Sequence, residues 1–264
     1  MIPAFHISEN GEQSASIQVI TGGQAWYLDY SASAFTASQD SLHIVIGENR
    51  FSDAEVHLNV EQEDLSLHGE VEFSPFQILK SDIMGPFQWF AKMECVHSVI
   101  SMRHVLRGRL EINDSVLDFN EGIGYIEADR GRSFPATYLW TQCLWDNCSM
   151  MLSIADIPLG KLQFAGCICA IVLDGKEYRL ATYWGVRILN WSDKGASLRQ
   201  GKYRLEVDLL EQKAQPLRAP SDGNMSRTIH ESLCARIRYR FWQGDRLLFD
   251  HTDDSTSFEY AQKP

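Results

Sequence analysis

The chain has 264 residues, of which 44% are hydrophobic and 22% charged, an ordinary composition for one large or two small folded domains. Its formal net charge of −11 argues against binding nucleic acid through a basic surface. No signal-peptide pattern opens the sequence, and no apolar run reaches the ~18 residues of a membrane helix. We expect a cytoplasmic protein with no nucleic-acid partner and no integral membrane segment, and we leave transient membrane contact open.

Strand patterns recur along the first half of the chain, with Gly, Asn, Asp and Ser between them, whereas almost nothing favours a helix. Alternation of apolar and polar residues predicts strands at 14–20, 25–30, 41–46, 55–60, 64–73, 93–110 and 117–120. The segment 75–88 is rich in Phe and Pro, and we expect a loop or a short helix there.

The second half shows clearer strands and one strong hairpin signal, Asp174-Gly175. Strands are predicted at 124–129, 137–142, 148–155, 162–173, 177–185, 186–191, 203–210, 228–242 and 246–250. The segment 214–225 holds two prolines and a glycine, which predicts a surface loop and a candidate lid. The whole pattern is typical of an all-β sandwich or barrel.

The stretch 122–142, GIGYIEADRGRSFPATYLWTQ, concentrates acids, arginines and aromatic residues in one short segment. We interpret it as a hairpin-like corner between two strands, because Gly131 lies between two arginines and Phe134-Pro135 follows. The residues on its polar and aromatic face, or at its turn, are Tyr125, Glu127, Asp129, Arg130, Arg132, Tyr138, Trp140 and Gln142. The solvent-facing side of a strand usually carries a mixture of Lys, Glu and Thr. This face does not, so we interpret it as a candidate site.

A second concentration of polar residues lies in the strand 93–110. Strict alternation would point Glu94 and His104 to one side and His97 to the other. A face that mixes charge with large apolar groups is typical of a ligand-binding barrel interior. A buried Glu–His pair that satisfies itself is an equal alternative, because buried acids are normally paired.

The cysteine and histidine spacings predict neither a metal site nor a disulfide. Cys143, Cys148, Cys167 and Cys169 lack the Cys-x-x-Cys spacing and a companion His pair of a zinc site. We expect them to be buried free thiols, in keeping with a reducing compartment. Nucleotide-binding glycine motifs and the nucleophile elbow are also missing. We therefore expect no metal and no cofactor.

The central motif resembles the signature of the tocopherol cyclase-like family, which has bacterial members and a plant enzyme. The similarity rests on Gly-x-Gly-Tyr-Ile-Glu-x-Asp-Arg-Gly-Arg-Ser-Phe-Pro, followed by aromatic-x-Trp-x-Gln. The stretches 83–106 and 177–185 are similar to the bacterial branch, and 225–235 extends the resemblance along the chain. The resemblance implies two lipocalin-like antiparallel halves, which we place at 1–120 and 121–264. Relatives usually begin with a further strand carrying Glu-Gly-Trp-Tyr, which we expect to be missing here.

The resemblance also implies a reaction, the cofactor-free cyclisation of a prenylated quinol or a similar hydrophobic small molecule. An acid protonates the alkene, aromatic faces stabilise the cation, and the phenol oxygen attacks. The proton donor would be Asp129, with Glu127 and Glu94 as the next candidates. The expected ligand-binding residues are Tyr125, Arg130, Arg132, Tyr138, Trp140, Gln142, His97 and His104.

Three readings of these residues remain open, together with the substrate and the oligomeric state. The first is this enzyme. The second is a non-catalytic carrier of a lipid or pigment, which needs the cavity but no protonated acid. The third is a structural corner in which Arg130 and Arg132 pair with Glu127 and Asp129 and keep the acids ionised.

Overall fold

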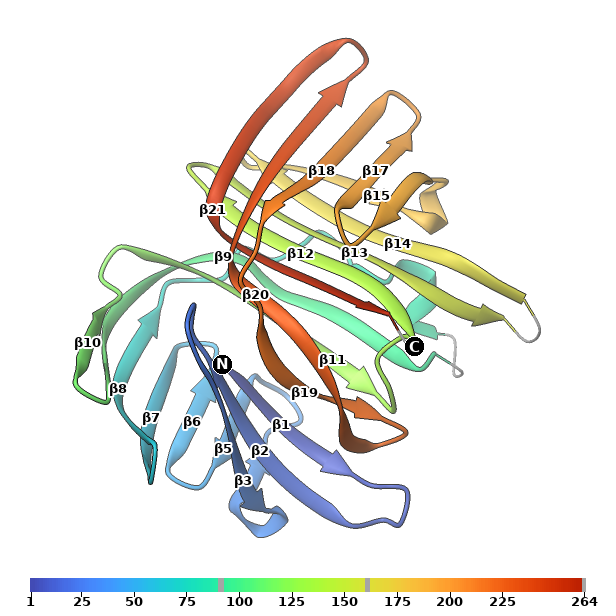
Figure 1. The fold of residues 1–264 in the computed structure, drawn as a ribbon. Coiled ribbons are helices and arrows are strands. Elements are labelled where there is room, and N and C mark those ends of the chain that lie inside the picture. Colours follow the sequence, from blue (N-terminus) through green and yellow to red (C-terminus); the bar gives the residue numbers. More distant parts are fainter. Residues whose placement is uncertain (90–92, 160–161, 263–264) are drawn as a thin grey trace.

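The computed structural model describes residues 1–89, 93–159 and 162–262, most of which lie in antiparallel strands (Figure 1). These ranges contain no α-helix, only the 3₁₀ turns η1 (Ala32–Ala34), η2 (Gly85–Trp89) and η3 (Thr182–Trp184). The prediction of an all-β protein is confirmed. Positions 90–92 of the 83–106 motif lie outside the described residues. No helix in the described part of the chain has the length and apolarity to cross a lipid bilayer.

Two sheets form the first half of the molecule. Sheet A contains β1 (Ile2–Ile7), β2 (Gln13–Ile20) and β3 (Ala25–Ser31), in that order. Sheet B contains β4 (Phe35–Ala37), β5 (His43–Ile46), β6 (Asn49–Ser52), β7 (Glu55–Gln62), β8 (Leu65–Phe73), β9 (Cys95–Ile112), β10 (Ser115–Asp118) and β11 (Gly122–Gly131). One apolar face of each sheet packs in a shared core that includes Ile17, Leu28, Leu58 and Leu67. Burial of these alternating side chains holds the two sheets together.

The remaining strands form sheet C. They are β12 (Thr137–Trp145), β13 (Cys148–Leu159), β14 (Leu162–Leu173), β15 (Lys176–Ala181), β16 (Arg187–Ser192), β17 (Gly195–Gln200), β18 (Tyr203–Glu211), β19 (Gln215–Ser221), β20 (Asn224–Gln243) and β21 (Arg246–Gln262). Their order is β15-β14-β13-β12-β21-β20-β18-β17-β16, and β19 pairs with β20. Near the two ends of this order, the Gln200 amide of β17 bonds the backbone of Arg179 and Ala181 on β15. The sheet thus curves around a core that includes Tyr239, Phe241 and Phe258.

Long strands connect the two halves of the molecule. β20 pairs with β18 along its second part and with β19 along its first part, which lies near sheet A (Figure 1). The Gln18 amide of β2 accepts from the Arg218 N–H and donates to the Arg218 carbonyl on β19, at 2.8 and 2.9 Å. A buried side-chain amide therefore joins sheet A to sheet C where no backbone ladder does.

Two expectations about the second half are wrong. β11 and β12 form no hairpin, because β11 pairs with β9 in sheet B whereas β12 pairs with β13 and β21 in sheet C. The segment 214–225 is no open loop, because Gln215–Ser221 is a strand paired with β20. Its prolines are tolerated because β19 is an edge strand with a single neighbour. The strands at 2–7, 35–37, 49–52 and 195–200 were not expected.

The expected boundary near Asn120 falls just before a strand of the first half. β11 begins at Gly122 and extends sheet B, and sheet C begins with β12 at Thr137. The division at 120 stays a prediction.

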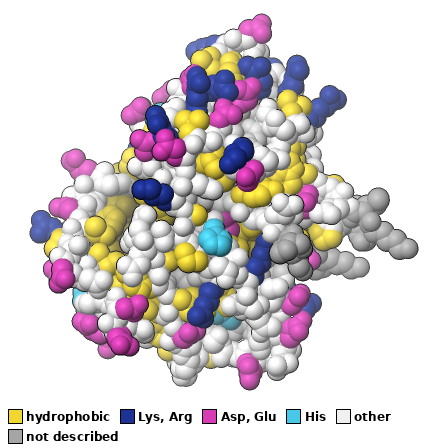
Figure 2. Space-filling model, in the orientation of Figure 1, with side chains coloured by type: hydrophobic (Ala, Val, Ile, Leu, Met, Phe, Trp, Pro, Cys, Tyr) yellow, Lys and Arg dark blue, Asp and Glu magenta, His cyan; other side chains and the backbone are white. Residues whose placement is uncertain are grey.

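Charged side chains of both signs are mixed over the visible face of sheet C (Figure 2). Arg240 contacts Glu206 and Asp208 at 2.8 Å, and Arg238 contacts Asp250 at 2.6 Å. Surface pairs of this kind contribute little each to stability.

Candidate functional site

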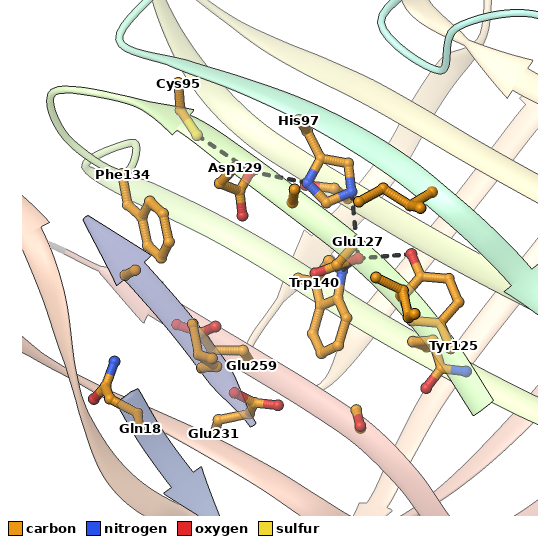
Figure 3. Close-up of a pocket in the computed structure, with 18 of the residues that line it drawn as sticks. Gln18, Cys95, His97, Tyr125, Glu127, Asp129, Phe134, Trp140, Glu231 and Glu259 are labelled. Carbon is orange, nitrogen blue, oxygen red and sulfur yellow. Dashed lines mark hydrogen bonds and ion pairs between the residues drawn. The ribbon is translucent and has the colours of Figure 1, made fainter. Parts of the chain in front are cut away.

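A cavity of about 1170 Å³ lies between the three sheets and receives side chains from all of them. Its walls are largely apolar, with Ile20, Phe51, Phe73, Leu106, Ile123, Phe134, Ile157, Leu217 and Ile229 among the lining residues. Its volume lies somewhat above the roughly 300–1,000 Å³ that is typical of small-molecule sites. Two groups of titratable side chains project into it, and both lie in the view of Figure 3.

The first group, which we call the acid–imidazole cluster, consists of Glu127, His97 and Asp129. Asp129 lies opposite His97 in the β9–β11 ladder, with Oδ1 3.0 Å from Nδ1. The other ring nitrogen, Nε2, lies 3.3 Å from Glu127 Oε2. Burial by itself would lower the pKa of His97, but the two carboxylates outweigh it and raise that pKa to about 10. The imidazole is therefore a cation held between two acids.

Hydrogen bonds from two aromatic side chains fix the Glu127 carboxylate. The Tyr125 hydroxyl donates to Oε2 at 2.6 Å, and the Trp140 indole N–H donates to the same atom at 3.1 Å. His97 Nε2 lies near the same oxygen as an ion-pair contact, without a hydrogen bond. This arrangement suits an ionised carboxylate, which accepts and does not donate.

The second group, which we call the glutamate pair, consists of Glu231 on β20 and Glu259 on β21. The two residues are directly opposite in the ladder, and both line the cavity. The Tyr138 hydroxyl donates to Glu259 Oε1. Burial raises the pKa of Glu259 to about 8 and that of Glu231 to about 7, with neighbouring carboxylates adding to both. The pair therefore retains a proton near neutral pH.

Trp140 lies between the two groups. Its indole N–H bonds Glu127 of the cluster, while its backbone position on β12 is directly opposite Glu259 on β21. Figure 3 shows the ring between the labelled Glu127 and Glu259. An aromatic surface thus separates an acid that keeps its proton from acids that face a cation.

His104 lines the cavity as a neutral side chain. Burial lowers its pKa to about 4. Ser101 Oγ lies 2.9 Å from Nδ1, and the Phe73 and Phe76 rings pack against the imidazole at 4.8 and 4.9 Å. A Cβ at Gly124 would lie 2.2 Å from Nε2, so only glycine leaves room for this ring.

The structure brings together most of the predicted site residues, but three lie elsewhere. Glu94 is exposed, and its backbone carbonyl accepts from the Arg132 and Ser133 amides. Arg130 lines a separate shallow surface pocket, and the Arg132 side chain is exposed beside Glu9 at 3.9 Å. Neither arginine is paired with the acids, so the ion-paired corner is wrong in its partners. The cation beside Glu127 and Asp129 is His97.

The predicted side-chain directions are confirmed on β12 and are wrong on β9. Tyr138, Trp140 and Gln142 share the cavity face as predicted, and the Gln142 amide nitrogen is buried there without a hydrogen-bond partner. His97 and His104 both line the cavity, although alternation assigned them to opposite faces. The β9–β11 register shifts twice between these positions, which breaks simple alternation.

The sequence reasoning missed Glu231 and Glu259. Both occur in long alternating strands in which an acid is ordinarily solvated, and neither belongs to the central motif. A usable signal was present for Glu231, which lies inside the family-like stretch 225–235. For Glu259 only the pairing of β20 with β21 and β12 reveals the location.

Six free cysteines occur, and Cys143, Cys148, Cys167 and Cys169 are buried, as predicted. In the described residues two sets of side chains have potential ligand atoms within 4.8 Å of one another: Cys143, His251 and Asp253, and the acid–imidazole cluster. In the cluster each His97 nitrogen already faces a carboxylate, which is the geometry of an ion pair.

No protein-family model matches the chain, and no curated protein matches it in sequence. Among solved structures, kievitone hydratase from Nectria haematococca has 9% identity and a TM-score of 0.55, over 98% of this chain and 88% of that one. CghA with Sch210972 has 11% identity and a TM-score of 0.55, over 95% of this chain and 80% of that one. At such identities the likeness shows a shared fold. Family membership itself stays a prediction.

Proposed function

We propose that the protein is tocopherol cyclase-like: it binds a hydrophobic, isoprenoid or prenyl-quinol-like molecule and catalyses its cyclisation without a cofactor. The observation that carries the proposal is one cavity that combines apolar walls with two differently charged acid groups. A buried acid, an aromatic surface and a water-poor space are what protonation of an alkene requires. The fold is shared with a protein named as a hydratase and with one crystallised with Sch210972, which supports small-molecule chemistry here.

A non-catalytic carrier of a lipid or pigment is the second candidate. The acid–imidazole cluster favours it, because His97 already contacts both Glu127 and Asp129 without a substrate. The two candidates share the ligand class and differ in turnover. For either one we propose a cytoplasmic location, in keeping with six free thiols.

Ligand binding is tested by incubating the purified protein with a cell lipid extract and identifying retained molecules by mass spectrometry. Ala155 on β13 is half-buried and lines the cavity, so Ala155→Trp should occupy part of the binding space and reduce retention. Ala37→Trp, at an exposed position of β4, is the matched control and should retain the ligand. Equal retention by both variants would show that the ligand binds elsewhere, and no retention by the wild type would refute both candidates.

Turnover is tested by incubating the protein with a geranyl-substituted hydroquinone and following the cyclic isomer by chromatography. The enzyme reading predicts an isomer of unchanged mass that forms without added cofactor. Binding without conversion of any prenylated quinol would favour the carrier.

A further inference from the structure

One transverse row of side chains crosses three neighbouring strands at the cavity wall. Trp140 on β12 is opposite Glu259 on β21, and Glu259 is opposite Glu231 on β20. Side chains opposite one another in a ladder project to the same face of a sheet. The indole and both carboxyl groups therefore lie side by side toward the cavity, as Figure 3 shows.

Apolar side chains lie around this row, in which Glu259 is buried and Trp140 and Glu231 are half-buried. Glu259 is 6% exposed, and an apolar cluster around Tyr138 includes Leu217, Ile229 and Phe134. The Phe134 ring packs edge-on against Tyr138 at 5.9 Å. Two carboxyl groups that face each other in such surroundings do not both ionise readily.

Two cations act on the pair, but neither outweighs the effect of burial. The Met1 amino group lowers the pKa of Glu231, and Arg227 lowers that of Glu259, yet both pKa values stay raised. The Arg227 guanidinium donates to the carbonyls of Phe134, Pro135 and Ala136 at 2.7 to 3.4 Å, so backbone groups occupy it. In contrast, Asp129 and Glu127 each face the His97 cation. The cavity thus holds a proton-rich carboxyl pair on one side of Trp140 and a carboxylate–imidazolium cluster on the other.

We propose that the glutamate pair is the proton donor of this site and Asp129 the proton acceptor, for a substrate that carries an alkene and a hydroxyl group. This assignment rests on the proposed cyclase function and moves the donor role from Asp129 to Glu231 and Glu259. A cation beside a carboxyl group favours its ionised form, which has no proton to donate and can still accept one. Trp140, between the two groups, offers its ring face to the cation that forms between them.

The step balances without any further reactant. A carboxyl O–H bond of the pair breaks, and the alkene π electrons bind the proton as a new C–H bond, which leaves a tertiary cation. A lone pair of the substrate hydroxyl then forms the C–O bond, and the hydroxyl proton passes to Asp129. Water returns a proton to the pair and removes one from Asp129. The product is an isomer of the substrate.

The probe for the test is the geranyl-substituted hydroquinone, incubated in D₂O. The wild type should form a cyclic product with one new C–D bond. Glu259→Gln should lower kcat by roughly 10²- to 10⁴-fold and should place no deuterium in recovered substrate. Asp129→Asn should also slow cyclisation, but recovered substrate should still acquire deuterium, because reversible protonation of the alkene survives. Glu12→Gln, at an exposed position, is the matched control.

The outcomes distinguish a failure of the donor assignment from a failure of the proposed cyclase function. A wild type that never cyclises the probe overturns the cyclase proposal and the donor assignment together. A wild type that cyclises it, with a folded Glu259→Gln protein that does so equally fast, overturns the donor assignment alone.

Glu231→Gln is the second variant, in case Glu259→Gln does not fold. It leaves a single carboxyl, so the alkaline limb of its pH–rate profile should move to lower pH, and an unmoved limb would count against the pair.

Discussion

Replacing Glu259 by Gln should stabilise the folded protein at neutral pH, although it removes a buried hydrogen-bonded carboxyl group. Glu259 is 6% exposed, and its pKa is raised by burial to about 8. The folded protein must therefore keep this proton where the unfolded chain has released it. Gln has nearly the same shape and can still accept the Tyr138 hydrogen bond, but it needs no proton.

The magnitude follows from the two pKa values of Glu259. Each pKa unit corresponds to about 1.4 kcal/mol, and the group goes from 4.5 in the unfolded chain to about 8 in the fold. Its raised pKa contributes stability that is full below pH 4.5 and is lost as the pH rises through 8. The loss is about 3 kcal/mol at pH 7 and approaches about 5 kcal/mol above pH 8, relative to acid. Glu259→Gln removes this dependence.

The assay is urea unfolding, followed by tryptophan fluorescence, at several pH values between 4.5 and 8.5. The difference in unfolding free energy between variant and wild type should be near zero at the acid end and grow with pH. At pH 7 the variant should melt on the order of 5–10 °C higher. Glu12→Gln controls for the loss of one carboxyl group at an exposed position.

The charged groups around the glutamate pair determine how far its pKa values are raised. The carboxylates of Asp129, Glu127 and Glu231 disfavour ionisation of the pair, whereas Arg227 and the Met1 amino group favour it. These groups remain in the variant, so the comparison isolates the proton of the pair. Parallel stability curves for wild type and Glu259→Gln across this pH range would refute the reasoning, since Glu259 would then ionise as freely in the fold as in water.

Two further substitutions test the geometry on the other side of the cavity. Asp129→Asn removes one of the two carboxylates that raise the pKa of His97 to about 10, so an NMR titration should find that pKa lower; a value still near 10 would show that Glu127 suffices. Gly124→Ala would place a Cβ 2.2 Å from His104 Nε2 and should cost about 1–3 kcal/mol in urea unfolding, whereas Gly23→Ala, with nothing within 4 Å, should be nearly neutral. Equal stability of the two alanine variants would contradict the packing around His104.

The β class and one face of the site could be predicted from the sequence because they depend on local pattern. Period-2 alternation fixes which residues of a regular strand share a face, and Tyr138, Trp140 and Gln142 of β12 follow it. Buried free cysteines also followed from their place in apolar strands.

The errors share one physical cause. The sequence of a strand does not specify which other strand it pairs with. β11 and β12 are adjacent in sequence, yet each pairs with a different sheet. Register shifts in β9 place His97 and His104 in one cavity, because a bulge depends on both paired strands. β19 carries prolines and is still a strand, because only one of its edges is paired.

By itself the sequence determined an all-β chain and a dense polar and aromatic motif, because side-chain alternation and turn chemistry are local properties. Only the tertiary structure decided which acids hold protons. Glu127 and Asp129 lie beside His97, whereas Glu231 and Glu259 lie opposite each other among apolar side chains. Protonation depends on desolvation and on the charges within a few ångströms, and distant parts of the chain supply both.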